Sequence, residues 1–186
     1  MASLILASSS ARRKELLEQV GLHFEVFSPD IDESIAEAES AQDYVARLAQ
    51  QKAQAVLTQF PQATVIAADT SVVIDARIIG KPESKQHAFE IWSALSGRCH
   101  QVMTGICVMY QQQQYSRVVC TEVEFQTLSL ADMESYWQTG EPLGKAGSYA
   151  IQGYAAQFIP TIQGSYSNVV GLPLHETLQL LKMIER

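Results

Sequence analysis

Residues 4–22 read LILASSSARRKELLEQVGL, and this stretch contains the local change of structure on which the fold depends. The apolar run at 4–7 predicts a short buried strand, and the apolar residues at helical spacing that follow it predict a helix over 11–20. Ser10 is a typical N-terminal cap for that helix, and Gly21 is a typical residue at its end. A strand that passes directly into a helix indicates an α/β protein.

Arg12 and Arg13 fall in the first turn of this helix, where the helix dipole already leaves positive partial charge. Cations at that end destabilise a helix by roughly a few tenths of a kcal/mol each, unless an anion lies beside them. A phosphate chain would reverse the effect, because it would meet free backbone N–H groups, serine hydroxyls and guanidinium groups together. The alternative is a pair of solvated arginines beside a plain helix cap, and this stretch alone leaves both interpretations open.

Outward from this stretch, apolar periodicity predicts helices and strands in mixed order. Helices are expected at 40–59, at 84–95, at 130–138 and from 174 onward. Strands are expected at 23–27, along the apolar run 64–75, and as a hairpin of 102–110 with 115–125. Because a hairpin is antiparallel, the sheet is expected to be mixed rather than purely doubly wound, and the fold class is α/β.

The composition limits the classes of protein to which the chain can belong. With 186 residues, of which 47% are apolar, it is long enough for one sizeable core, and a single domain over 1–186 is expected. The net charge of −7 disfavours nonspecific nucleic-acid binding, and no apolar stretch approaches the roughly 20 residues that a membrane span needs. Three cysteines without close spacing favour a reducing cytoplasm over a disulfide framework. We therefore expect a cytoplasmic protein with no nucleic-acid or membrane partner, in which a local basic cluster meets any polyanionic ligand.

Three further polar residues stand at positions where they could face a cleft. Lys52 occupies the apolar stripe of the helix at 40–59, although a lysine at the edge of such a stripe is the commoner explanation. Asp69 ends the apolar run 64–68, which would place a carboxylate at the carboxyl end of a strand or in an ordinary strand-end turn. Lys81 lies between glycine and proline in an extended turn, where its side chain could point into a cleft or into solvent.

An acidic segment, SPDIDES, adds carboxylates to these cations. Its Asp30, Asp32 and Glu33 could face a phosphate site across a divalent cation, or form a solvated acidic loop. The chain has no GxxxxGK[ST], GxGxxG or GxSxG motif, and its histidines lack zinc-ligand spacing. Together, these signals indicate a metal-dependent, phosphate-handling enzyme on another scaffold.

A set of motifs in order along nearly the whole chain resembles the Maf family of nucleoside triphosphate pyrophosphatases. The motifs are LASSSARRKELL, DES, QKA, AADTSVV, GKP, LSG…HQVMTG, GEPLGKAGSYAIQG and GSYSNVVGLPL. The resemblance implies a Maf/Ham1 (inosine-triphosphatase-like) fold, with an elongated mixed sheet, flanking helices and two lobes around a cleft. It also implies a cytoplasmic homodimer that hydrolyses a nucleoside triphosphate to the monophosphate and pyrophosphate with Mg²⁺ or Mn²⁺.

The resemblance carries site residues over by position. The phosphate-binding opening motif is matched by Ser8, Ser10 and Arg13. The catalytic set is matched by Glu33, Lys52, Asp69 and Lys81, of which Glu33 and Asp69 are the implied metal ligands. In this scheme the cations hold the triphosphate, while Asp69 activates the attacking water or chiefly binds metal.

Three positions that differ between branches of the family hold Arg12, Thr70 and Gln152 here. This combination resembles the branch that acts on dTTP and UTP, whereas the 7-methyl-GTP branch has Trp, Gln and Glu. Noncanonical purine triphosphates are an alternative substrate class. A non-catalytic nucleotide-binding regulator of septum formation is the alternative outside enzymes, and the intact acid–lysine set argues against it.

Three positions depart from the family pattern. Ala11 replaces the usual proline at the first helical position, which should loosen the turn slightly rather than abolish binding. Gln51 replaces a glutamate, and Gly144 replaces the expected aspartate before KAG. The Gly144 change argues against a salt-bridging or metal-binding role at that position.

Overall fold

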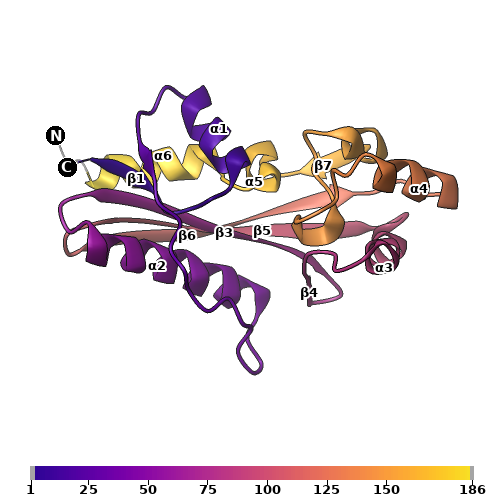
Figure 1. Ribbon diagram of the computed structural model, residues 1–186, viewed down its shortest axis with the longest axis horizontal. Coiled ribbons are helices and arrows are strands. Elements are labelled where there is room, and N and C mark those ends of the chain that lie inside the picture. The colour runs from indigo at the N-terminus through magenta and orange to yellow at the C-terminus, as the bar shows by residue number, and fades with distance from the viewer. Residues whose placement is uncertain (1–2, 185–186) are drawn as a thin grey trace.

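A seven-stranded mixed sheet runs along the computed structural model, which describes residues 3–184 (Figure 1). Six strands follow in the order β2-β1-β3-β5-β6-β7, and β4 pairs with β3 beside that path. β1 is parallel to β2 and β3, whereas the remaining pairs are antiparallel. The strands are β1 (Leu4–Leu6), β2 (Glu25–Val26), β3 (Thr64–Ile74), β4 (Arg77–Ile79), β5 (Cys99–Tyr110), β6 (Gln113–Glu124) and β7 (Thr161–Gln163). The expected mixed α/β sheet with its long hairpin is confirmed.

Helices flank this sheet on both faces, with α2 on one side and α1 and α6 on the other (Figure 1). The α-helices are α1 (Ala11–Gln19), α2 (Ala41–Gln59), α3 (Lys85–Leu95), α4 (Leu130–Gln138), α5 (Tyr166–Val170) and α6 (Leu174–Ile184). Two short 3₁₀ helices, η1 (Ala146–Ser148) and η2 (Tyr154–Phe158), lie between α4 and β7. The sequence predicted every α-helix here except the five-residue α5. Within residues 3–184, no helix has both the length and the apolar character needed to cross a membrane.

β3 contributes to a core on each face of the sheet, because successive side chains of a strand point to opposite faces. Val65 and Ala67 pack in one apolar cluster with Ala53 of α2. Ile66 and Ala68 belong to a larger cluster that also includes residues of α1, α3 and α6. Burial on both faces explains why β3 is a near-continuous apolar run.

The parallel part of the sheet contains a topological switch point. From β1 the chain passes through α1 to β2 on one side, and then through α2 to β3 on the other side. In open α/β sheets, ligands bind beyond the carboxyl end of the strand where the order reverses in this way. The carboxyl end of β1, at Leu6, is therefore the expected position of a ligand site.

Asp69 lies in the middle of β3 rather than at its carboxyl end, so that expectation was wrong. The strand continues because antiparallel pairing with β5 extends from Val65 to Val73, with Asp69 opposite Gly105. The pairing of β3 with β1, by contrast, ends at Ile66. Asp69 consequently lies just beyond the end of β1, and the carboxylate still reaches the switch point.

One polar residue of the core is His100, which is only 3% exposed. Its Nε2 atom lies 2.8 Å from the hydroxyl of Tyr149, and its ring meets Phe125 edge-on at 5.2 Å. Its Nδ1 atom has no hydrogen-bond partner among the residues described. Burial lowers the pKa of His100 to about 4, so the folded protein favours the neutral imidazole.

We expect acid to destabilise the protein partly through His100. Because its pKa is lower in the folded than in the unfolded chain, stability is lost as the pH falls from about 6.5 towards 4. Between pH 7 and pH 5, the free energy of unfolding should fall by about 2 kcal/mol more in the wild type than in His100→Asn, which cannot titrate there. Urea unfolding at both pH values measures the two losses. Equal losses in the two proteins would contradict the prediction.

Candidate active site

A cleft of about 620 Å³ opens beyond the carboxyl end of β1. Its walls come from the β1–α1 turn, an acidic loop (residues 28–39), α2, the middle of β3 and the segment 143–149. Within residues 3–184, its lining includes five cations and two carboxylates: Arg12, Arg13, Lys52, Lys81, Lys145, Glu33 and Asp69. An excess of three positive charges in a chain of net charge −7 indicates a site for a polyanion.

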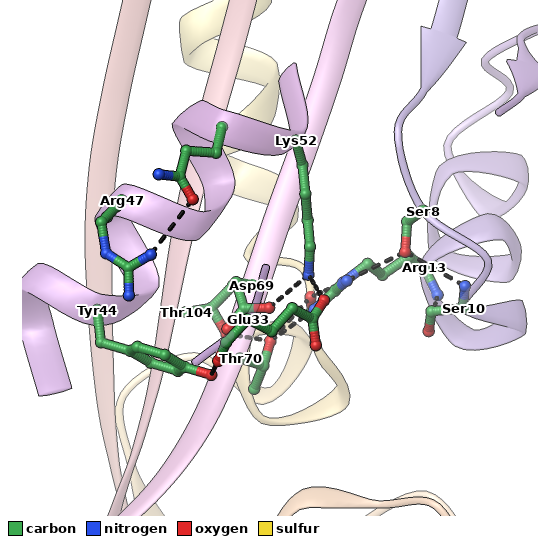
Figure 2. A network of polar contacts seen from close by, with 12 residues as sticks. Ser8, Ser10, Arg13, Glu33, Tyr44, Arg47, Lys52, Asp69, Thr70 and Thr104 are labelled. Carbon is green, nitrogen blue, oxygen red and sulfur yellow. Dashed lines mark hydrogen bonds and ion pairs between the residues drawn. The ribbon is translucent and has the colours of Figure 1, made fainter. Parts of the chain in front are cut away.

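Ser8, Ser10 and Arg13 lie together at the N-terminus of α1 (Figure 2). The hydroxyl of Ser10 accepts a hydrogen bond from the backbone N–H of Arg13, which confirms Ser10 as the helix cap. The buried hydroxyl of Ser8 accepts from the backbone N–H of Ser10 at 3.2 Å and from Nη1 of Arg13 at 3.1 Å. The turn that the sequence singled out therefore forms one wall of the cleft.

Arg13 lines the cleft, and within residues 3–184 its guanidinium donates only to neutral acceptors. Its Nε donates to the carbonyl of Gly171 at 2.8 Å, and its Nη2 donates to the hydroxyl of Thr70 at 3.1 Å. Thr70 in turn lies 2.9 Å from the hydroxyl of Thr104 on β5. Burial lowers the pKa of Arg13, partly opposed by the charge of Asp69, although a guanidinium stays protonated at neutral pH. These contacts fix the orientation of the Arg13 guanidinium, and its positive charge remains available to an anionic ligand.

Lys52 joins the two carboxylates of the cleft (Figure 2). Its Nζ atom lies 2.7 Å from Oδ1 of Asp69 and 2.7 Å from Oε1 of Glu33. Lys52 and Asp69 are buried, at 8% and 9% exposure, while Glu33 enters from the exposed acidic loop. The stripe position of Lys52 on α2 therefore points its ammonium into the cleft, not out to solvent.

The charge state of Glu33 follows from its neighbours. Burial is the largest single influence and raises the pKa of Glu33, whereas the hydrogen bond and the charge of Lys52 lower it. The charges of Lys81 and Arg13 act in the same direction, so the net pKa of Glu33 is lowered. Glu33 is therefore an ionised carboxylate at neutral pH, as a cation ligand must be.

Three further cations line the cleft away from Lys52 and its two carboxylates. Lys81 is exposed, and Arg12 and Lys145 are half-buried. The structure gives none of the three an ion pair within residues 3–184; the ammonium of Lys145 donates to the backbone carbonyl of Glu141. Burial lowers the pKa of Lys145, as does the charge of Arg12, which is the response of a cation held among like charges.

The three branch-specific positions do not all meet in the cleft. Arg12 and Thr70 line it, whereas Gln152 is exposed and lies outside the lining. Glu141 anchors the chain two residues after Gln152, because its carboxylate accepts a hydrogen bond from the backbone N–H of Tyr154 at 2.8 Å. The part of Gln152 in base selection stays a prediction.

Three further residues that line the cleft were not predicted from the sequence: Lys145, Tyr44 and Tyr149. Lys145 lies in the motif GEPLGKAGSYAIQG, so a lysine among glycines was the available signal. Tyr44 gave no signal, because a tyrosine in the first turn of a long helix is ordinary. Tyr149 lines the cleft together with the apolar residues Val72, Ile78, Ile79 and Val102.

The two carboxylates fit a magnesium site completed by a ligand. Glu33 and Asp69 both touch the same ammonium atom, so their oxygens are close together, and carboxylate oxygens are the donors that Mg²⁺ and Mn²⁺ prefer. No group of three or more His, Cys, Asp and Glu side chains suited to a metal occurs within residues 3–184. Mg²⁺ is commonly bound by one or two carboxylates together with substrate phosphates, which matches this pair.

Fold and site together define a class: a mixed α/β protein with a cationic cleft at the switch point of its sheet and paired carboxylates inside it. The family model described as Maf-like protein matches residues 3–184. The chain therefore belongs to the Maf family, as its motifs predicted.

Individual relatives are similar over nearly the full chain. A protein of Acinetobacter baylyi named dTTP/UTP pyrophosphatase is 66% identical over 97% of this chain and 98% of its own length. A Colwellia psychrerythraea protein of the same name is 53% identical over 96% of this chain and 86% of its own. Among solved structures, a HAM1 protein from Coxiella burnetii has a TM-score of 0.48 and 20% identity, covering 67% of this chain and 73% of that one.

Proposed function

We propose that this protein is a metal-dependent nucleoside triphosphate pyrophosphatase that hydrolyses dTTP and UTP to the nucleoside monophosphate and pyrophosphate. The observation that carries the proposal is the buried carboxylate of Asp69, held by Lys52 in a cleft with three excess positive charges. A triphosphate supplies the negative charge that such a cleft attracts, and a carboxylate placed among cations suits proton transfer or metal binding. The names of its relatives in Acinetobacter baylyi and Colwellia psychrerythraea support the reaction and the two substrates.

The triphosphate is held by the turn after β1 and by the cations opposite it. Backbone N–H groups at the start of α1, with the hydroxyls of Ser8 and Ser10, bind phosphate oxygens. Arg13 offers a pre-oriented guanidinium fork, and Lys81 and Lys145 neutralise the remaining charge.

Asp69 orients the attacking water and accepts its proton as the water oxygen bonds to the α-phosphorus. Lys52 holds this buried carboxylate in place through a contact of 2.7 Å between its Nζ atom and Oδ1 of Asp69. The bond from the α-phosphorus to the bridging oxygen breaks, and pyrophosphate leaves with the electron pair of that bond. The cations around the cleft stabilise the charge that develops on this leaving group.

Glu33 and Asp69 are the proposed ligands of Mg²⁺ or Mn²⁺. When bound, the ion would add positive charge beside the phosphates and so favour departure of pyrophosphate. Lys52 contacts both carboxylates and would share them with the ion.

The nucleoside packs against apolar residues of the cleft lining, among them Tyr149 and Val102. Arg12 and Thr70 border the cleft, and Gln152 recognises the pyrimidine edge, since a carboxamide both donates and accepts hydrogen bonds. Because Gln152 lies outside the cleft lining, this reading requires the segment around it to approach the base. We further propose that the protein is a homodimer and that it is cytoplasmic, where the free thiols of Cys99, Cys107 and Cys120 would stay reduced.

The test is a product assay in water labelled with ¹⁸O. The purified protein is mixed with Mg²⁺ and, separately, dTTP, UTP, CTP, GTP or 7-methyl-GTP, and phosphorus NMR identifies the products. We expect pyrophosphate and monophosphate from dTTP and UTP, with the label in the monophosphate, and no turnover after chelation with EDTA.

Other outcomes would each overturn a defined part of the proposal. Label in pyrophosphate would mean attack at the β-phosphorus, and orthophosphate would mean cleavage at the γ position. Faster turnover of 7-methyl-GTP or of modified purine triphosphates would replace the substrate assignment. Tight nucleotide binding without turnover would favour the non-catalytic regulator.

A further inference from the structure

The acidic loop carries Glu33 into the cleft without support from the sheet. Its residues 28–36 belong to no helix or strand, and residues 37–38 form only a turn. Within residues 3–184, no backbone–backbone hydrogen bond joins 28–38 to another segment of the chain. A loop with so few backbone contacts needs side chains from elsewhere if Glu33 is to keep one position.

One face of α2 supplies these side chains (Figure 2). The hydroxyl of Tyr44 donates to the backbone carbonyl of Glu33 at 2.8 Å. Nη2 of Arg47 donates to the backbone carbonyl of Ser34 at 2.9 Å, one residue further along. Residues three apart on a helix are neighbours on its surface, so both contacts come from adjoining positions.

Arg47 also closes the far end of the acidic loop. Its Nε and Nη2 atoms contact the two carboxylate oxygens of Glu39 at 2.6 and 2.7 Å, a bidentate pair. Glu39 in turn accepts from the backbone N–H of Ala36 at 3.0 Å, and the guanidinium of Arg47 lies 5.5 Å from the centre of the Tyr44 ring. Arg47 thereby links both ends of the 34–39 part of the loop to α2.

We propose that Tyr44 and Arg47 are positioning residues that hold Glu33 against Lys52 and Asp69. The inference rests on the proposed function, in which Glu33 is a metal ligand of the triphosphate site. Lys52 lies on the same helix, five residues after Arg47, so α2 positions both partners of the Glu33–Lys52 ion pair. We call the side chains of Tyr44 and Arg47 the tethers of the acidic loop. Loss of either tether removes a hydrogen bond to the backbone at Glu33 or Ser34, while the Glu33 carboxylate itself remains.

The tethers keep their hydrogen-bonding roles over the working pH range. Hydrogen bonds from Arg47 lower the pKa of Glu39 to about 2, so the pair stays ionised. Burial, with the charges of Asp69 and Glu33, raises the pKa of Tyr44 to about 12, so its hydroxyl remains a donor.

The test compares Tyr44→Phe, Arg47→Met and Arg47→Lys with a matched control, Arg98→Met. Arg98 also forms an ion pair, at 2.6 Å with Asp75, but lies outside the cleft lining. Hydrogen exchange over 28–39 is measured by mass spectrometry on each folded protein. The Mg²⁺ concentration that gives half-maximal pyrophosphate release at saturating dTTP is measured on the same samples.

We expect Arg47→Met to speed exchange in the acidic loop by about tenfold. It should also raise the half-maximal Mg²⁺ concentration by about tenfold, because loss of a residue that orients a metal ligand typically weakens metal binding by at least that much. Tyr44→Phe should give smaller changes of both kinds, because it removes a single hydrogen bond. Arg47→Lys should fall between Arg47→Met and the wild type, since lysine keeps the charge without the fork. Arg98→Met should change neither quantity.

Unchanged loop exchange in both Tyr44→Phe and Arg47→Met would overturn the proposal. Faster exchange with unchanged Mg²⁺ dependence would also overturn it, because the residues would then hold the loop without positioning Glu33. If the wild type turns over no triphosphate, the proposed function fails, and the exchange measurement still reports whether the tethers hold the loop.

Discussion

Asp69→Asn is expected to lower the turnover number for pyrophosphate release from dTTP by about 10²–10⁴-fold, the usual contribution of a positioned acid–base group. Asparagine has nearly the same shape but neither accepts the proton of an attacking water nor binds a divalent cation as well as a carboxylate. The KM for dTTP should stay unchanged or fall, because the substitution removes a negative charge beside a polyanion. Steady-state kinetics at saturating Mg²⁺ separate the two parameters.

The control for this prediction is Asp75→Asn. Asp75 follows the same strand, lies outside the cleft lining and pairs with Arg98 on the exposed surface. Its substitution should leave the turnover number within about twofold of wild type, as exposed ion pairs contribute little. If Asp69→Asn remains folded and keeps a third or more of the turnover, Asp69 is neither the base nor an essential metal ligand.

The parts of the fold that sequence predicts well are those specified locally. Ser10, Ser40 and Ser84 each cap a helix that the sequence placed correctly, and each cap is a contact within three residues. The five-residue α5 was not predicted, because its segment is too short to show a helical period. The apolar run 64–75 predicted the extent of β3, but the position of Asp69 in the middle of the strand was not predicted, since it depends on pairing with β5, where Asp69 lies opposite Gly105, 36 residues away in sequence.

The same distinction holds for the candidate site. Ser8, Ser10 and Arg13 contact one another within one turn, so a strand–serine–arginine pattern was enough to indicate them. Lys52 was conspicuous because it replaced an apolar residue in a stripe. Lys145 lines the same cleft as the other cations only because the chain folds back on itself, and no local sequence pattern predicts that proximity.

Gly105→Ala is expected to destabilise the fold by about 3 kcal/mol or more, at the upper end of the range for overpacked cores. Gly105 lies in β5, opposite Asp69, and the backbone of α2 passes directly over it. A methyl group there would lie 2.2 Å from the carbonyl oxygen of Val45 and 2.8 Å from the backbone nitrogen of Ala46. Both contacts are with helix backbone, so relief requires α2 itself to move by more than 1 Å towards a normal contact of roughly 3.5 Å.

Gly80→Ala is the matched control, because a methyl group at Gly80 would meet nothing within 4 Å and the residue has no positive φ. Urea unfolding should place Gly80→Ala within about 0.5 kcal/mol of the wild type, as for an unstrained surface change. Gly105→Ala within 1 kcal/mol of wild type would mean that α2 shifts easily. That result would also bear on the site, since α2 carries Tyr44, Arg47 and Lys52. A helix that shifts easily could not hold Glu33 and Asp69 at fixed positions, whereas a large loss of stability indicates that close packing on Gly105 fixes the helix that orients them.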